Sequence, residues 1–216
     1  MERNYTTYRI SCFFFWLWYT VLHSFKMRGR KRVPKTGSFI AAANHVSLGD
    51  PPAVTAVRSQ RFISFMAKRE LFEGKRWGWW FKAMNCIPTN RDGNDVGAVK
   101  EAIKRLKNGG AVAIFPEGTR SVNGDFGKPQ VGIGFVQDKT GVPVIPFYVQ
   151  GTDKALPKGG KYKVFSPVAI YVGENVDLSG AKEIENNRER YQYISNKVME
   201  AIATIKRQVE EGTFKD

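Results

Sequence analysis

Apolar residues recur every three or four positions in several segments of the chain, and these segments alternate with short, continuous apolar runs. The first spacing predicts amphipathic helices, whereas short apolar runs bounded by turn residues predict buried strands. Strands are predicted at 38–43, 62–67, 85–89, 111–115 and 142–150, with one or two more in 162–172. Helices are predicted at 10–25, 51–57, 95–107, 132–140 and 181–211. This order predicts an α/β fold, a single domain with a largely parallel central sheet flanked by helices.

Three of the predicted helices carry more specific signals. Pro51 and Pro52 open the helix at 51–57, which places Asp50 at its capping position. The helix at 95–107 is expected to bury one face, made of Val96, Val99, Ile103 and Leu106. The last helix is expected to bury Tyr191, Ile194, Val198, Ile202 and Ile205.

The first predicted helix is the most apolar part of the chain and is rich in aromatic residues. One side carries Ile10, Phe13, Phe14, Leu17, Trp18, Val21, Leu22 and Phe25, and the other carries Phe15, Trp16 and Tyr19. The helix is shorter than the roughly 20 residues that span a bilayer, and it lacks the small-residue cleavage site of a signal peptide. Trp and Tyr suit the headgroup level of a membrane.

A basic run follows this helix directly: Lys26, Arg28, Arg30, Lys31, Arg32 and Lys35. Basic residues beside an apolar helix favour binding to an anionic membrane surface. We therefore expect residues 1–30 to form an interfacial membrane-anchor helix with a basic segment, and residues 31–216 to form the main domain. His23 is assigned to the interface. The alternative is an ordinary core helix followed by a solvated basic loop.

Composition limits the classes of protein that fit. The chain has 216 residues, of which 42% are hydrophobic and 25% charged. This composition excludes a disordered chain and a polytopic membrane protein. The net charge of +14 predicts an anionic partner, either nucleic acid or a membrane surface. A second mixture of basic and aromatic residues, at 68–81, favours the membrane. Cys12 and Cys86 lack metal-ligand spacing, which argues against a disulfide scaffold or a zinc site and favours the cytoplasmic side.

Polar loops at 44–50, 89–91 and 116–120 follow predicted strands, where ligands bind in open α/β sheets. The neutral imidazole of His45 can accept a proton at physiological pH. Asp50 can hold the other ring nitrogen and stabilise the imidazolium, as the carboxylate of a Ser-His-Asp triad does. His45 is therefore a candidate general base. The alternative is a structural histidine beside an N-cap aspartate.

The segment from Phe115 to Arg120 reads Phe-Pro-Glu-Gly-Thr-Arg. Its glycine lets the backbone turn tightly or approach a ligand closely, and its arginine offers a planar fork suited to phosphate. Glu117 is a candidate for orienting that arginine or for contacting a ligand hydroxyl. Arg91 and Lys128 are further candidates for binding phosphate. A surface turn with a salt bridge is the alternative.

Four segments in this order resemble the glycerolipid acyltransferase family, specifically the bacterial 1-acylglycerol-3-phosphate acyltransferases. They are Asn44–Asp50, similar to N-H-x-S-x-x-D; Ala67–Phe72 with Gly78-Trp79 and Ile87–Arg91; Phe115–Ser121, which reads F-P-E-G-T-R-S; and Val142–Pro146. The resemblance implies that His45 is the base and Asp50 its partner. It also implies that the glycerol phosphate is handled by Arg91, Glu117, Gly118, Thr119 and Arg120. Lys128 is a looser match, because Pro129-Gln130 departs from the residues expected there.

The resemblance further implies acyl transfer from acyl-CoA or acyl carrier protein to the 2-hydroxyl of 1-acylglycerol 3-phosphate, giving phosphatidic acid for phospholipid biosynthesis. No cofactor, metal or covalent enzyme intermediate is expected. The expected partners are an anionic membrane surface, lysophosphatidic acid and the acyl donor, but no nucleic acid. A monotopic or peripheral position on the cytoplasmic face of the cell membrane is expected. The alternatives are acyl transfer to a lysophospholipid or lyso-ornithine lipid, or a non-enzymatic basic module that binds membranes or nucleic acid.

Overall fold

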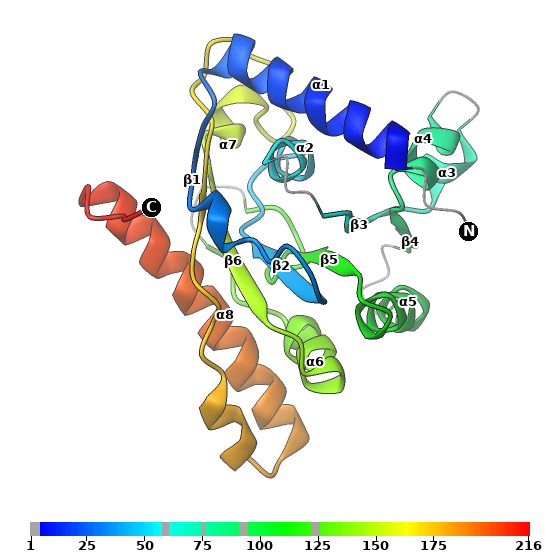
Figure 1. Ribbon diagram of the computed structural model, residues 1–216, viewed down its shortest axis with the longest axis vertical. Helices are drawn as coiled ribbons and strands as arrows, with labels where there is room; N and C mark the ends of the chain where they lie inside the picture. The colour runs from blue at the N-terminus through cyan, green and yellow to red at the C-terminus, as the bar shows by residue number, and fades with distance from the viewer. Residues whose placement is uncertain (1–4, 58–60, 75–76, 91–94, 122–125) are drawn as a thin grey trace.

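A computed structural model describes residues 5–57, 61–74, 77–90, 95–121 and 126–216. Within these ranges, seven strands form one sheet in the order β1-β7-β6-β2-β5-β3-β4 (Figure 1). They are β1 (Lys26–Arg28), β2 (Phe39–Ala43), β3 (Ile63–Lys68), β4 (Ile87–Thr89), β5 (Ala111–Ile114), β6 (Val144–Gln150) and β7 (Ala169–Val172). Neighbouring strands run parallel except β6 and β7, which pair antiparallel. The predicted α/β fold with a largely parallel sheet is confirmed.

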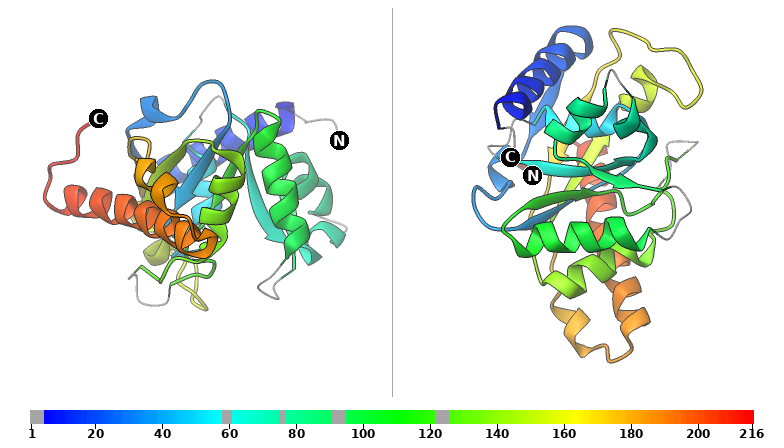
Figure 2. Two further views of the ribbon diagram at one scale, coloured as in Figure 1. Left: turned by 90° about the horizontal axis from the view of Figure 1, so that it is seen from below. Right: turned by 90° about the vertical axis from the view of Figure 1, so that its right-hand side faces the viewer.

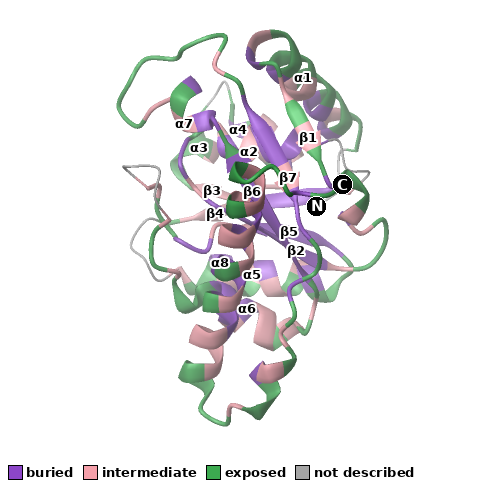
Figure 3. Ribbon diagram, turned by 90° about the vertical axis from the view of Figure 1, so that its left-hand side faces the viewer, coloured by how far each residue is buried: buried purple, intermediate pink, exposed green. Residues whose placement is uncertain are grey.

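Helices cover both faces of the sheet, which gives three layers (Figure 2). One face is covered by α1 (Tyr5–His23) and α2 (Asp50–Thr55), and the other by α5 (Val96–Lys107), α6 (Val131–Thr140) and α8 (Asn187–Glu210). Successive residues of β2 face opposite layers: Phe39 and Ala41 pack under α2, whereas Ile40 packs with α5, α6 and α8. Figure 3 shows the consequence, a sheet whose strands are mostly buried.

The remaining elements are short. They are the helices α3 (Glu70–Glu73), α4 (Gly78–Ala83) and α7 (Thr152–Ala155) and the 3-10 turns η1 (Arg30–Arg32) and η2 (Ser179–Glu183). The last long helix begins six residues later than predicted, at Asn187. The Asn186 side chain accepts hydrogen bonds from the amides of Arg188 and Glu189, and thereby caps the helix there.

The predicted buried face of α5 is confirmed for Leu106, and Val99 and Ile103 pack partly against the core. Val96 contradicts the prediction, because it is 61% exposed. Ala98 and Ala102, one turn apart, are buried although the apolar spacing did not single them out. Their small side chains permit close packing, so Val99 and Ile103 flank this part of the contact. The predicted face of α8 is confirmed for Ile194, Val198, Ile202 and Ile205, which are all buried.

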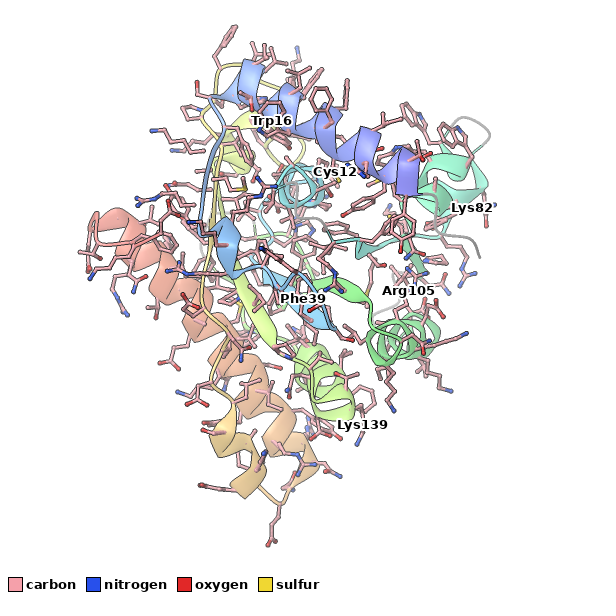
Figure 4. The ribbon with its side chains drawn as sticks, viewed as in Figure 1. Cys12, Trp16, Phe39, Lys82, Arg105 and Lys139 are labelled. Atoms are coloured by element: carbon pink, nitrogen blue, oxygen red, sulfur yellow. The ribbon has the colours of Figure 1, made fainter. Side chains whose placement is uncertain are left out.

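Helix α1 packs its less apolar side against the domain and exposes its most apolar side. Cys12 and Trp16, labelled in Figure 4, face the domain, as does the buried Tyr19. The exposed side carries Ile10, Phe13, Phe14, Leu17, Trp18 and Val21. None of the described helices combines the length and the apolarity that crossing a bilayer requires.

One expectation about this region needs correction. His23 is fully buried rather than interfacial, because its Nδ1–H donates to the Ser166 carbonyl (2.8 Å) and its Nε2 accepts from the Tyr162 hydroxyl. Part of the basic run is structured: residues 26–28 pair with β7 in the sheet, and the Arg32 guanidinium lies 2.5 Å from the Glu174 carboxylate. Contact of this run with an anionic surface stays a prediction. The division at residue 30 stays a prediction, although α1 packs directly on α2.

Candidate active site

The candidate site lies where three neighbouring strands end. β2 pairs with β5 on one side and with β6 on the other, all parallel, so their carboxyl ends meet at one edge of the sheet. The segments that follow these strands are residues 44–50, 115–121 and 151–152. The Ser121 amide donates to the His45 carbonyl (2.8 Å), which joins the first two segments directly.

His45 and Asp50 form the pair that the sequence predicts. Nδ1 of His45 lies 2.8 Å from Oδ2 of Asp50, which is fully buried. The same oxygen accepts the amides of Val46 (2.7 Å) and Ser47 (2.8 Å). Asp50 is thus the first residue of α2, and its carboxylate turns back to the preceding loop. The prediction that Asp50 caps this helix was wrong, because Gly49 is the N-cap residue and no side chain accepts from the first turn of the helix.

This arrangement leaves one nitrogen of His45 for chemistry. An ionised carboxylate only accepts hydrogen bonds, so Nδ1 carries the proton and Nε2 has the free lone pair. The imidazole stacks on the Phe115 ring, with centroids 4.1 Å apart and planes inclined by 21°. The His45 side chain remains 17% exposed. The ring is thus held in place by Asp50 and Phe115 while part of the side chain stays open to solvent.

Two residues that the sequence did not single out complete this network. The Thr152 hydroxyl donates to Oδ1 of Asp50 (2.5 Å), and Thr152 is fully buried. The Tyr19 hydroxyl, on α1, donates to the Gly49 carbonyl (2.8 Å). Burial, reinforced by the Asp50 charge, raises the pKa of Tyr19, so its hydroxyl stays a donor. Thr152 lies two residues after β6. This position points to the site only when β6 is known to pair with β2, and the sequence does not give that pairing.

Glu117 joins the segments around the site. The residue is buried, and its Oε1 accepts the His45 amide (2.8 Å) while its Oε2 accepts the Gly127 amide (2.7 Å). Both oxygens of Glu117 accept backbone amides, so these contacts do not show the predicted role of Glu117 in orienting Arg120. A contact between Glu117 and a ligand hydroxyl stays a prediction.

The other predicted binding residues lie near this junction, with one exception. Gly118 has φ +69°, a conformation that favours glycine, and it is exposed together with Thr119. Arg120 is half-buried and forms no ion pair within the described part of the chain. Lys128 is exposed and follows Gly127, which Glu117 holds. Arg91 lies outside the described residues, after β4, the edge strand.

The geometry fits deprotonation of a hydroxyl, near a segment that carries a cation without an ion pair among the described residues. The base is held by a buried carboxylate, and the backbone that carries Arg120 is tied to the base's own backbone through Ser121. In the described ranges, no group of three or more His, Cys, Asp and Glu side chains is arranged to hold a metal ion.

Comparisons with known proteins agree with this geometry. Residues 24–150 match the family model described as Acyltransferase. The chloroplastic 1-acyl-sn-glycerol-3-phosphate acyltransferase of Brassica napus is 30% identical over 162 residues, which are 70% of this chain and 46% of that protein. The 1-acyl-sn-glycerol-3-phosphate acyltransferase of Bacillus subtilis is 27% identical over 179 residues, 80% of this chain and 89% of that protein.

A solved structure is similar over nearly the whole chain. The crystal structure of the 1-acyl-sn-glycerophosphate (LPA) acyltransferase PlsC from Thermotoga maritima superimposes with a TM-score of 0.73 at 29% identity, and the match covers 94% of this chain and 79% of that one. The chain thus spans less than half of the Brassica protein but most of the two bacterial proteins.

Proposed function

This chain belongs to the acyltransferase family, and we propose that it moves a fatty acyl group to the 2-hydroxyl of 1-acylglycerol 3-phosphate, giving phosphatidic acid. The activity is carried over from the names of the Brassica, Bacillus and Thermotoga proteins. The acyl donor in this proposal is a thioester, either acyl-CoA or acyl carrier protein.

The observation that carries the proposal is the 2.8 Å contact between His45 Nδ1 and Asp50 Oδ2, while Nε2 makes no hydrogen bond to the described part of the chain. In the proposed reaction, the acceptor oxygen attacks the thioester carbonyl carbon while its proton passes to Nε2. The tetrahedral intermediate then collapses, the carbon–sulfur bond breaks, and the leaving thiolate takes the proton from the imidazolium. Asp50 stabilises that imidazolium. The hydroxyl is itself the nucleophile, so the scheme uses no cofactor, metal or acyl-enzyme.

The phosphate of the acceptor would be held by Arg120, aided by Lys128 and Arg91. A charge-assisted contact to a half-buried guanidinium would place the 2-hydroxyl beside the base, which reduces the entropic part of the barrier. The oxyanion donors in this proposal are backbone amides other than those of His45, Val46, Ser47 and Gly118, because each of these four already donates to a protein oxygen.

We place the enzyme on an anionic membrane surface, on the cytoplasmic face of the cell membrane. The support is the exposed apolar side of α1 together with two exposed tryptophans at the start of α4, Trp77 and Trp79. Aromatic side chains of this kind favour the interface between headgroups and acyl chains. Neither Cys12 nor Cys86 forms a disulfide within the described residues, which suits a reducing compartment.

The test is transfer of a labelled acyl group from acyl-CoA, and separately from acyl carrier protein, to 1-oleoylglycerol 3-phosphate in detergent. Wild type and His45→Ala are compared, with 1-oleoyl-lysophosphatidylcholine as the alternative acceptor. We expect phosphatidic acid from the wild type and a rate at least about a hundredfold lower from His45→Ala. Thermal unfolding of both proteins controls for folding.

Two results would overturn the proposal. Equal transfer to lysophosphatidylcholine would show that the phosphate monoester is not recognised. A folded His45→Ala protein with the wild-type rate would show that this imidazole is not the base.

A further inference from the structure

A loop far from α1 in sequence lies beside the C-terminal end of that helix (Figure 1). Residues 157–166, here called the lysine loop, contain Lys158, Lys161 and Lys163 and no acidic residue. All three lysines are exposed. Three large apolar residues of the loop are exposed as well: Tyr162, Val164 and Phe165. The loop therefore combines positive charge with exposed apolar groups.

The backbone of the lysine loop is held against α1. The Phe165 amide donates to the Leu22 carbonyl (2.7 Å), and the Trp18 indole N–H donates to the Tyr162 hydroxyl (2.8 Å). That hydroxyl donates in turn to the buried His23. These contacts fix the loop next to Trp18 and Leu22, and Trp18 belongs to the exposed apolar side of α1. Exposed apolar residues of the loop therefore lie beside the exposed apolar side of the helix.

Phe165 occupies this surface in an uncommon way. Its φ is +61°, in the left-handed region that non-glycine residues rarely adopt, and 77% of the residue is exposed. A phenylalanine that makes little contact with the domain, on a backbone held in such a conformation, is a candidate for contact with a partner outside the chain.

We infer that the lysine loop is a second membrane contact, in which Phe165 and Val164 enter the interface while Lys158, Lys161 and Lys163 bind anionic lipid headgroups. The inference rests on the membrane surface proposed above and adds a second attachment point, which fixes the rotation of the molecule about α1. A lipid surface fits better than an acidic protein, because the apolar residues of the loop lie beside those of α1.

The experiment is co-sedimentation of the full chain with two kinds of vesicle, pure phosphatidylcholine and phosphatidylcholine with phosphatidylglycerol. The first variant is Phe165→Asn with Val164→Ser, in which asparagine tolerates the left-handed backbone. Its control is Val96→Ser, which removes an apolar residue that is 61% exposed on α5. The second variant changes Lys158, Lys161 and Lys163 to Gln. Its control changes Lys100, Lys104 and Lys107, all exposed on α5, to Gln, so the net charge is matched.

We expect the apolar variant to bind both kinds of vesicle several-fold more weakly than Val96→Ser does. The lysine variant should lose roughly fivefold affinity per lysine for the anionic vesicles, an effect that shrinks as salt is added. Equal binding by each variant and its α5 control would overturn the inference. So would unchanged vesicle binding with a loss of transfer from acyl carrier protein alone, because the loop would then bind the carrier protein.

Acyl transfer in detergent separates this inference from the proposed function. Both loop variants should retain the wild-type rate with acyl-CoA in detergent, since the loop is outside the His45 site. A wild-type protein that binds vesicles through the loop but transfers no acyl group would leave the membrane contact standing and remove the enzymatic proposal. A loss of detergent activity in both loop variants would overturn the inference, because the loop would then belong to the active site.

Discussion

At the residue scale, Thr152 is the most informative position, because it reaches Asp50 but is too deeply buried to touch a substrate. Thr152→Val keeps the shape and removes the hydroxyl, which leaves a buried carboxylate oxygen short of a donor at a cost of about 1–3 kcal/mol. We expect kcat to fall at least about tenfold with little change in KM for the acceptor, and Thr152→Ser to restore it. Steady-state kinetics of the three proteins provides the test. A Thr152→Ser protein as slow as Thr152→Val would show that packing, not the hydrogen bond, is at issue.

Arg120 should show the opposite kinetic pattern. If it holds the acceptor phosphate, Arg120→Gln removes a charge-assisted contact worth about 1.5–3 kcal/mol, so KM should rise roughly tenfold to a hundredfold. Arg207→Gln, on an exposed position of α8, is the matched control. Initial rates over a range of 1-oleoylglycerol 3-phosphate concentrations measure both. The same KM in the two variants would exclude this role for Arg120.

The predicted and the missed site residues differ in sequence separation. His45 and Asp50 are five positions apart, and the turn between them could be predicted from Pro51 and Pro52. Thr152 is 102 positions from Asp50, and its role depends on which strand adjoins β2. Apolar periodicity identifies strands but contains no information on their order in the sheet, so this neighbour could not be predicted.

At the element scale, the packing of α6 on α8 depends on one glycine. A Cβ on Gly134 would lie 2.0 Å from the Tyr191 carbonyl oxygen, whereas a Cβ on Gly132, in the same helix, would meet nothing within 4 Å. Gly134→Ala should therefore push the helices apart and destabilise the protein by about 1–3 kcal/mol or more. Gly132→Ala should stabilise it by about 0.5–1 kcal/mol, because alanine favours the helix. Urea unfolding of both variants measures the change in the free energy of unfolding. A loss of stability in Gly132→Ala would contradict this account.

The long elements could be predicted because their apolar spacing is repeated over several turns, as in α8 and α1. Their ends and contact faces depend on features that the spacing does not contain. The start of α8 is set by the Asn186 cap, and the buried face of α5 by the two small alanines that sit closest to the sheet. In α1 the most apolar side faces outward. The apolar spacing alone would place that side in the core of the chain.

At the scale of the whole molecule, buried tyrosines should limit stability at high pH. Burial raises the pKa of Tyr148 to about 12, and burial also raises the pKa of Tyr8 and Tyr19. A group whose pKa is raised by folding stabilises the folded state fully below its unfolded pKa, near 10 for tyrosine, and this contribution is lost as the pH rises toward the folded pKa. Each such group should lower the free energy of unfolding by about 1.4 kcal/mol per pH unit in that window.

Chemical denaturation between pH 8 and pH 11.5 would test this expectation. Tyr148→Phe should make the decline less steep above pH 10, because phenylalanine does not titrate. Tyr5→Phe, at a position that is 55% exposed, should leave the slope unchanged. Identical slopes in wild type and Tyr148→Phe would mean that this ring opens to solvent before it ionises.

The two oxygens of the Glu117 carboxylate cross-link two segments beside the site. One oxygen accepts the amide of His45 and the other accepts that of Gly127. Glutamine has the same length but only one oxygen, so in Glu117→Gln one of the two amides must face an NH2 group instead of an acceptor. This exchange of an oxygen for an NH2 group would release either the segment of His45 or that of Gly127, and faster hydrogen exchange at one of the two amides would reveal which segment is released.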